Sequence, residues 1–168
     1  KSAIREAVQD RNMPFLGVCL GHQLLAETLG GGVDRMAEPE VGLMDVHLTQ
    51  TGRSDPLFDG VTESFPCLQW HSCEISVIPK GCEVLATSPL CAIQAIRMGQ
   101  RAYGLQFHVE LTADTVAEWA KVPAYKESLE CALGVGALAR LESDIAVSLP
   151  NFNATARRLY KNFSALIR

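Results

Sequence analysis

The sequence lacks the features that mark several classes of protein. Its 168 residues contain 15 Lys and Arg against 19 Asp and Glu, and the formal net charge of −4 gives no electrostatic reason to bind nucleic acid. No apolar run approaches the roughly 18–20 residues that a membrane span needs, and residues 1–12 form a charged amphipathic stretch rather than a signal peptide. Repeats and low-complexity tracts are also missing. We therefore expect a cytoplasmic globular protein that has neither a nucleic-acid nor a membrane partner.

The six cysteines lack the tight, even spacing of a disulfide scaffold. Without a secretory signal they are better interpreted as reduced thiols, most of them small core residues. An initiator methionine is missing as well, since the chain starts at Lys1 and its first methionine is Met13. We expect that the chain lacks an N-terminal portion.

The hydrophobic pattern predicts strands and helices up to about residue 110 and helices after it. Residues 2–12 have helical spacing, residues 15–18 form a short apolar run typical of a strand, and residues 20–29 are helical again until three glycines end the pattern. Short strands between turn signals are expected in the middle of the chain, at residues 46–48, 65–70, 84–86, 92–98 and 102–108.

From residue 112 onward the spacing is helical, with apolar stripes over residues 126–149 and 153–167 that predict two or three amphipathic helices. Such stripes need a surface to pack against. We expect residues 112–168 to be a helical extension packed on the rest, so that residues 1–168 form a single domain.

The segment with the strongest chemical pattern joins the strand at residues 15–18 to the helix that follows. Cys19 lies at this junction between Gly17 and Gly21. Small flanking residues let such a turn adopt strained dihedral angles, so that the thiol projects from the strand end while the helix N-terminus offers free N–H groups to an oxyanion. The donor would be the amide of Leu20. The alternative is a buried cysteine in a glycine-rich turn.

A second apolar strand ends in a histidine and a carboxylate. His108 and Glu110 are two residues apart, a spacing that puts both side chains on one face of an extended chain. A base that activates a thiol needs a third group to orient it, and Glu110 could hold His108 while His108 takes the proton of Cys19. A lone histidine at a strand end is more often structural, but here it accompanies the cysteine turn.

Together these motifs resemble the class I glutamine amidotransferases, whose glutaminase domains contain G-x-C-x-G-x-Q and a later F-H-P-E. The resemblance spans residues 14–110, and two motifs in this order about 90 residues apart are far more specific than either alone. The most similar subgroup is the stand-alone, GMP-synthase-like amidotransferases. The resemblance implies an α/β fold, a three-layer sandwich with a mostly parallel central sheet flanked by helices.

The resemblance also implies roles for individual residues. Cys19 would be the nucleophile, His108 the general base and acid, and Glu110 the residue that orients it. The amide of glutamine would be cleaved through a γ-glutamyl thioester, releasing ammonia for a synthetase partner, with no cofactor or metal. The residues implied in glutamine binding are Gly17, Gln23, His71, Ser72 and Cys73.

Three departures from the family pattern bear on these roles. Val109 replaces the usual proline between His108 and Glu110, which removes a fixed φ. Cys73 stands where an aspartate is expected after His71 and Ser72. Nothing before Pro14 matches the family's early strands and glycine-rich oxyanion loop, and losing one oxyanion donor costs about 100- to 1,000-fold in turnover.

These departures leave two alternatives to a glutaminase that supplies ammonia. The first is a γ-glutamyl peptide or amide hydrolase that uses the same thioester chemistry, as the missing aspartate suggests. The second is a non-catalytic binding relative, in which Cys19 would be unreactive.

Other candidate residues are given structural roles. We expect a structural role for His22, a solvated position for His47, and positions in the core or in a pocket wall for Trp70 and Trp119. Cys67, His71 and Cys73 form a C-x3-H-x-C cluster without the usual zinc-ligand spacing, so we expect no metal there.

Overall fold

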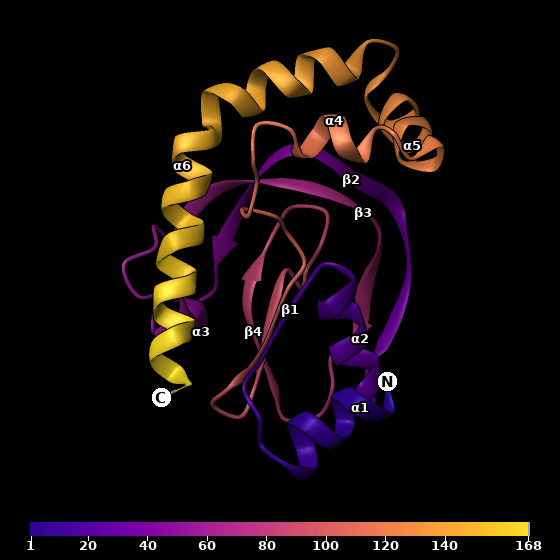
Figure 1. Cartoon of the computed structure of the whole chain (residues 1–168). Coiled ribbons are helices and arrows are strands. Elements are labelled where there is room, and N and C mark those ends of the chain that lie inside the picture. The colour runs from indigo at the N-terminus through magenta and orange to yellow at the C-terminus, as the bar shows by residue number, and fades with distance from the viewer. Residues whose placement is uncertain (168) are drawn as a thin grey trace.

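The computed structural model describes residues 1–167, which form one curved six-stranded sheet with helices around it (Figure 1). The strand order is β1-β6-β5-β4-β2-β3. The strands are β1 (Phe15–Val18), β2 (Gly32–Leu48), β3 (Ser64–Val77), β4 (Cys82–Thr87), β5 (Ala95–Met98) and β6 (Ala102–Leu105). The helices are α1 (Ser2–Arg5, continued by a π-helical turn at Glu6–Asp10), α2 (Leu20–Thr28), α3 (Gln50–Arg53), α4 (Thr115–Trp119), α5 (Pro123–Leu133) and α6 (Ala137–Leu166), with a 3₁₀ turn at Pro56–Phe58.

The α/β class with flanking helices is confirmed, but the expected mostly parallel sheet is not. Among the described strands only β1 and β6 pair in parallel, and the other four pairings are antiparallel. The reason is the length of the connections: β5 and β6 are joined by three residues around Gly99, whose φ is +60°, and such a link makes a hairpin rather than a crossover.

Three apolar clusters hold the layers together. On one face of the sheet, Tyr103 and Leu105 of β6 pack with Leu159 of α6. On the other face, Ala102 of β6 and Ile96 of β5 pack with Leu25 of α2. This alternation along β6 follows from the two-residue period of a strand. A third cluster joins β2 and β3 to the helical layer α4–α6 through Val41, Leu68, Leu129, Leu141 and Ile145.

The middle strands are longer than the sequence predicts. β2 includes residues 33–45, which carry Asp34, Arg35 and Glu38 and were not predicted as strand. These three side chains are exposed, because β2 and β3 form a long two-stranded arm that arches away from the rest of the sheet (Figure 1). One face of this arm is solvated, so its charge is compatible with β structure.

The C-terminal pattern differs from the prediction in one respect. The apolar stripes at residues 137–149 and 153–166 belong to one 30-residue helix, α6, which continues through Pro150. A proline inside a helix removes an N–H donor and favours a bend, and α6 changes direction along its length in Figure 1. Among residues 1–167, no helix combines the length and apolar character needed to cross a bilayer.

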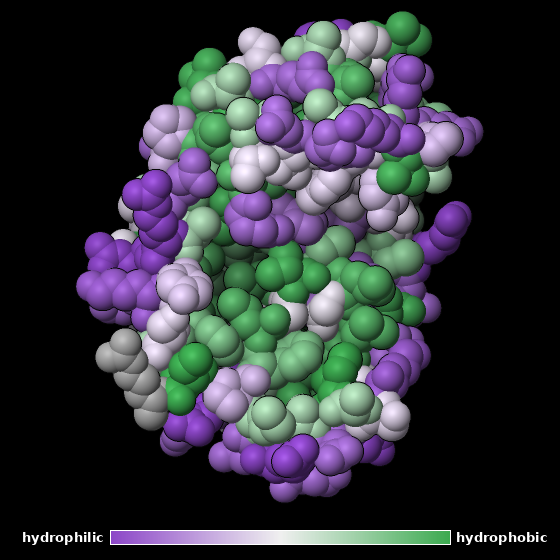
Figure 2. All heavy atoms as spheres, in the orientation of Figure 1, coloured by the Kyte–Doolittle hydropathy of each residue, from purple (hydrophilic) through white to green (hydrophobic). Residues whose placement is uncertain are grey.

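Apolar side chains gather on the molecular face where β1 lies (Figure 2). β1 is an edge strand of the described sheet and pairs on one side only, with β6. Its Phe15 and Leu16 remain half-buried. The carboxyl ends of these two parallel strands, Val18 and Leu105, therefore lie side by side, and the candidate site starts from them.

Candidate active site

Cys19 lies in a strained turn between β1 and α2. Its φ of +49° and ψ of −104° lie outside the usual regions for a residue with a side chain, and within residues 1–167 only Asn12 shares a positive φ without being glycine. The close approach of strand and helix requires Gly17, because a Cβ there would lie 2.5 Å from the backbone carbon and oxygen of Gly21. The strained strand–turn–helix geometry expected from the two glycines is thus present.

His108 and Glu110 follow the end of β6. Both backbone groups of His108 pair with Leu68 of β3, which holds the histidine next to the end of β1. Its Nδ1 lies 2.5 Å from Oε1 of Glu110, and its ring hydrogen-bonds to Cys19. A thiol, an imidazole and a carboxylate are therefore connected in the order that nucleophilic catalysis uses.

The replacement of proline by Val109 adds a hydrogen bond to this group. The backbone N–H of Val109 donates to Oε2 of Glu110 at 3.0 Å, while Oε1 faces His108. A proline has no N–H and could not make this contact. Glu110, although its side chain is half exposed, is held at both oxygens.

The charges of this group favour protonated His108 beside ionised Glu110. Burial opposes protonation, but hydrogen bonds to Cys19 and Glu110 outweigh it and raise the pKa of His108 to about 9. Burial likewise opposes ionisation of Glu110, yet hydrogen bonds from His108 and from backbone N–H groups lower the pKa of Glu110. His108 therefore has a strong affinity for a proton, as a base that must deprotonate a thiol requires.

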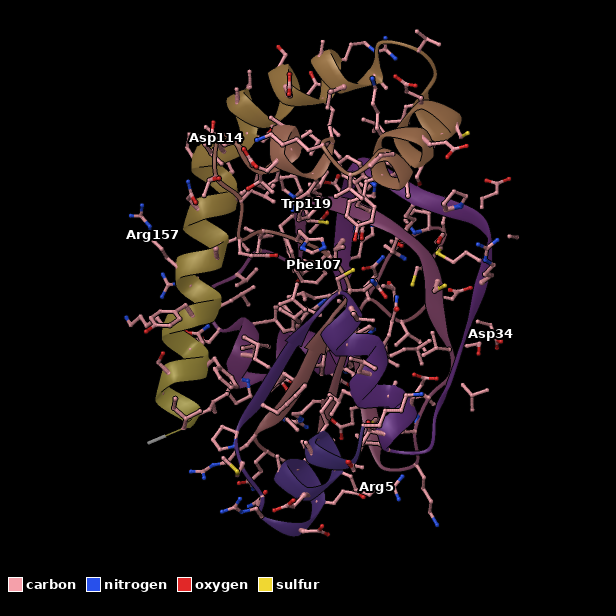
Figure 3. The ribbon with its side chains drawn as sticks, turned by 45° about the vertical axis from the view of Figure 1, so that its right-hand side comes forward. Arg5, Asp34, Phe107, Asp114, Trp119 and Arg157 are labelled. Carbon is pink, nitrogen blue, oxygen red and sulfur yellow. The ribbon has the colours of Figure 1, made fainter. Side chains whose placement is uncertain are left out.

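Two tryptophans lie beside the histidine, Trp119 from the helical layer and Trp70 from β3. Trp119 of α4 meets the ring of His108 edge to face, with centroids 4.9 Å apart, and it meets Trp70 in the same way at 5.5 Å. In Figure 3, Trp119 points from α4 toward the interior of the molecule, whereas Asp34 and Arg157 lie at the periphery. Trp70 and Trp119 thus wall the site.

A cavity of about 850 Å³ opens in front of Cys19. The candidate residues that line it are Cys19, Leu20, Gln23, His71, Ser72 and Cys73. Gly17 is buried beneath Gly21 and does not line it. The opposite wall is formed by α5, an element that the sequence predicted as helix without assigning it to the site; it contributes Ala124, Tyr125, Glu127, Ser128 and Cys131.

The sequence reasoning missed two buried residues of the site, Gln106 and Glu40. Gln106 donates from Nε2 to Sγ of Cys19 at 3.6 Å, and Glu40 lies 3.0 Å from Nε2 of His71. Both residues lie within stretches that match the family pattern. For Gln106 the available signal was a polar side chain inside an apolar strand, because such a residue, when buried, needs a partner. Glu40 lies in a charged stretch that was not predicted as strand, so it gave no such signal.

The remaining histidines have the positions that were expected. His47 is exposed. His22 is fully buried on α2, its Nε2 3.3 Å from the carbonyl oxygen of Ile93, and burial lowers the pKa of His22 to about 4. Gly104 of β6 allows this packing, since a Cβ there would lie 2.6 Å from Nδ1 of His22.

The C-x3-H-x-C cluster is not assembled as a metal site. Cys67 donates its S–H to the carbonyl of Met44, while His71 uses its two ring nitrogens on Glu40 and the Cys73 carbonyl. Within residues 1–167 no three metal-ligating side chains come together. All six cysteines are free thiols.

Sequence similarity links the chain to one protein family. The family model of class I glutamine amidotransferases matches residues 1–118. One subunit of the glutamine-hydrolyzing GMP synthase from Methanococcus maripaludis strain C5 is 38% identical over 101 residues, which cover 60% of this chain and 52% of that protein. The corresponding subunit from Methanocaldococcus jannaschii is 34% identical over 120 residues, covering 68% of this chain and 62% of that protein.

Two solved structures extend the similarity to nearly the whole chain. A glutamine amidotransferase from Thermotoga maritima is 28% identical with a TM-score of 0.83, covering 96% of this chain and 66% of that one. A glutamine amidotransferase from Methylobacillus flagellatus is 26% identical with a TM-score of 0.81, covering 99% and 68%. The chain thus spans about half to two thirds of the length of these relatives, and it belongs to the class I glutamine amidotransferases.

Proposed function

We propose that this chain hydrolyses the side-chain amide of glutamine through a γ-glutamyl thioester on Cys19. The observation that supports this most is the position of the Cys19 thiol, which lines the cavity from a strained backbone turn. It is hydrogen-bonded to His108, which Glu110 holds in turn. The Cys-His-Glu group and all of residues 1–168 would then be part of a single glutaminase domain.

The proposed reaction has two halves. His108 takes the thiol proton, the Cys19 sulfur attacks the amide carbon, and the backbone N–H of Leu20 stabilises the oxyanion. His108 then returns the proton to the leaving nitrogen, and ammonia departs from the thioester. In the second half His108 deprotonates a water, which attacks the thioester carbonyl, and the thiol is regenerated as glutamate leaves.

The substrate would lie between α2 and the segment from His71 to Cys73. Gln23 uses its Nε2 on the carbonyl of Cys73 and on Gln106, so its own Oε1 is left to accept an N–H of the ligand. Ser72 and the Cys73 thiol face the same cavity. Gly17 would act on the substrate only through the position of Cys19.

The ammonia would pass to a synthetase partner. The GMP synthase subunits to which this chain is similar are named for glutamine hydrolysis as one subunit of a synthase. Free ammonia is mostly protonated at neutral pH and is then not a nucleophile, so a glutaminase of this kind benefits from a partner that accepts ammonia directly.

A second candidate function is the hydrolysis of γ-glutamyl conjugates. Two observations favour it: the cavity of about 850 Å³ has room for a ligand larger than an amino acid, and Cys73 replaces the expected aspartate. In this case the leaving group is an amine rather than ammonia, and the steps on Cys19 and His108 are unchanged.

The test is to measure glutamate release from glutamine and from a γ-glutamyl dipeptide with the complete protein. We expect glutamine turnover that falls by at least ~10³-fold in Cys19→Ala. A preference for the dipeptide that Cys73→Asp reverses would support the second function instead. No turnover of either substrate, together with a Cys19 that does not react with iodoacetamide, would show a non-catalytic relative.

A further inference from the structure

A chain of hydrogen bonds runs from the buried pair of His71 and Glu40 to the sulfur of Cys19. Its middle link is the backbone carbonyl of Cys73, which lies 2.9 Å from Nδ1 of His71 and 3.0 Å from Nε2 of Gln23. A carbonyl oxygen only accepts hydrogen bonds, so both of these nitrogens must donate to it. The contact therefore fixes which end of the Gln23 amide faces the carbonyl.

The His71 end of this chain is anchored in the interior. The side chains of His71 and Glu40 are almost fully buried, with Nε2 of the histidine 3.0 Å from Oε2 of the glutamate. The two oxygens of Glu40 also accept from Ser88 at 2.5 Å and from Gln94 at 2.6 Å. Nδ1 of His71 donates to the Cys73 carbonyl, and Nε2 shares a hydrogen bond with Glu40, so both ring nitrogens are held. Such a pair resists disruption, because removing one partner leaves a buried polar group without a hydrogen bond.

The other end of the chain leads to the nucleophile. The second hydrogen on Nε2 of Gln23 donates to Oε1 of Gln106 at 3.0 Å. The oxygen of Gln106 is thereby turned toward Gln23, and its nitrogen is turned toward Sγ of Cys19, 3.6 Å away. Gln106 is fully buried. Reversing either amide would set two acceptors or two donors against each other, so the whole chain has one orientation.

From this ordering we infer that Gln106 is a further catalytic residue, an N–H donor to the sulfur of Cys19 whose amide is oriented by Gln23 and the Cys73 carbonyl. An N–H donor stabilises a thiolate more than a thiol, since hydrogen bonds to charged groups are roughly twice as strong as neutral ones. Gln106 thus supports the anionic sulfur at the moment when His108 holds the proton. His71 and Glu40 act at a distance and are positioning residues.

The inference rests on the proposed function only in taking Cys19 as the nucleophile. The effect of Gln106 on the Cys19 sulfur can be measured without glutamine. The quantity is the rate at which iodoacetamide alkylates Cys19, and peptide masses locate the label. Exposed Cys131 is an internal reference in the same molecule. We expect Gln106→Leu to slow the alkylation of Cys19 at neutral pH by ~10-fold or more, to move its profile to higher pH, and to leave Cys131 unchanged.

The matched control is Gln69→Leu. Gln69 of β3 is equally buried, but neither atom of its amide has a hydrogen-bond partner among residues 1–167. We expect Gln69→Leu to leave the alkylation profile in place. If Gln106→Leu is poorly folded, the nearly isosteric Gln106→Glu can replace it. This variant places an acceptor against the sulfur, and we expect it to slow the alkylation of Cys19 by the same factor.

A second measurement tests the chain itself. Gln23→Leu should slow alkylation less than Gln106→Leu, and the double variant should be no slower than Gln106→Leu alone, because Gln23 acts through Gln106. The inference would be overturned if Cys19 were alkylated at the same rate in Gln106→Leu, in Gln69→Leu and in the unmodified protein. It would also be overturned if Gln106→Leu and Gln69→Leu slowed the alkylation equally.

The failure of this inference can be told apart from failure of the proposed function. An effect of Gln106 on alkylation without any Cys19-dependent glutamine turnover would uphold the inference and reject the function. Glutamine turnover that depends on Cys19, together with an alkylation rate that Gln106→Leu does not change, would uphold the function and reject the inference.

Discussion

The sheet end around Cys19 and the helical layer α4–α6 are built by different rules. The buried polar side chains that the structure describes, among them His22, Glu40, Gln106 and His108, all lie between residues 22 and 108. Within residues 112–167 every buried residue is apolar. One region is therefore specified by hydrogen bonds and close backbone approach and the other by the size of apolar side chains. The sheet end around Cys19 should lose activity when an atom is added to it. The helical layer should lose only stability when atoms are removed from it.

Among the variants that test this comparison, the largest effect is expected from one added methyl group at Gly17. In Gly17→Ala the new Cβ would meet the Gly21 backbone at 2.5 Å, so β1 and α2 must separate and Cys19 must move. Because displacing a reacting atom by about 1 Å can cost 10²-fold, we expect Cys19-dependent glutamine turnover to fall by ~100-fold.

Gly21→Ala is the matched control for that variant. A Cβ at Gly21 has no atom within 4 Å, and its position in α2 favours alanine by up to ~1 kcal/mol. Steady-state kinetics and thermal unfolding of both variants would decide the matter. Equal losses at Gly17 and Gly21 would show that close approach does not specify this end of the sheet.

The helical layer should respond in the opposite way. Leu141 of α6 is 3% exposed and packs in the cluster that joins α6 to the sheet. We expect Leu141→Ala to lower the free energy of unfolding by about 2–5 kcal/mol and to leave the turnover per folded molecule unchanged. Val147→Ala, on the same helix at 81% exposure, should change the stability by less than ~0.5 kcal/mol. A large loss of turnover in folded Leu141→Ala would contradict the comparison.

Acid should unfold the protein partly through His22. Its pKa is lowered from 6.5 to about 4 by burial, so the folded state keeps it neutral while the unfolded state binds a proton. The contribution of His22 is fully present above pH 6.5 and is lost as the pH falls through about 4, which amounts to roughly 3 kcal/mol.

The measurement compares urea unfolding at pH 7.5 and pH 4 for the unmodified protein and for His22→Gln. We expect the variant to lose less stability on acidification, because other titrating groups act equally in both. His47→Gln, which removes an exposed histidine, should behave like the unmodified protein. If His22→Gln does so too, burial of His22 does not contribute to acid unfolding.

The same contrast explains which features could be predicted from sequence. The turn at Cys19 and the pair His108 and Glu110 were found because the information is local: glycines beside a cysteine, and two polar residues at the end of an apolar strand. β2 was missed over residues 33–45, because its charged residues look like a loop until β3, the partner strand, is known. Gln106 was missed as a site residue because its partner Gln23 is 83 residues away. In the helical layer, the apolar period predicted helices but not that α6 continues through Pro150.

The smallest expected effect tests Val109, where this chain departs from its family between His108 and Glu110. Val109→Pro would remove the N–H that donates to Oε2 of Glu110. A single hydrogen bond to a charged group would be lost, so we expect turnover to fall by about 3- to 10-fold. Glu110 would hold His108 less firmly, and the raised pKa of His108, about 9 in this protein, would fall. The alkaline limb of the kcat/KM profile should therefore move to lower pH.

Val109→Ala separates this hydrogen bond from packing. Val109 is 4% exposed in the apolar core, so the alanine variant loses side-chain contacts but keeps the N–H. We expect it to lower thermal stability while the alkaline limb stays in place. Because proline is the residue usual in the family at this position, the fold should accept it. A shifted limb in Val109→Pro alone would mean that valine strengthens the hold on Glu110, whereas the same profile in both variants would mean that His108 holds Glu110 without help from the backbone.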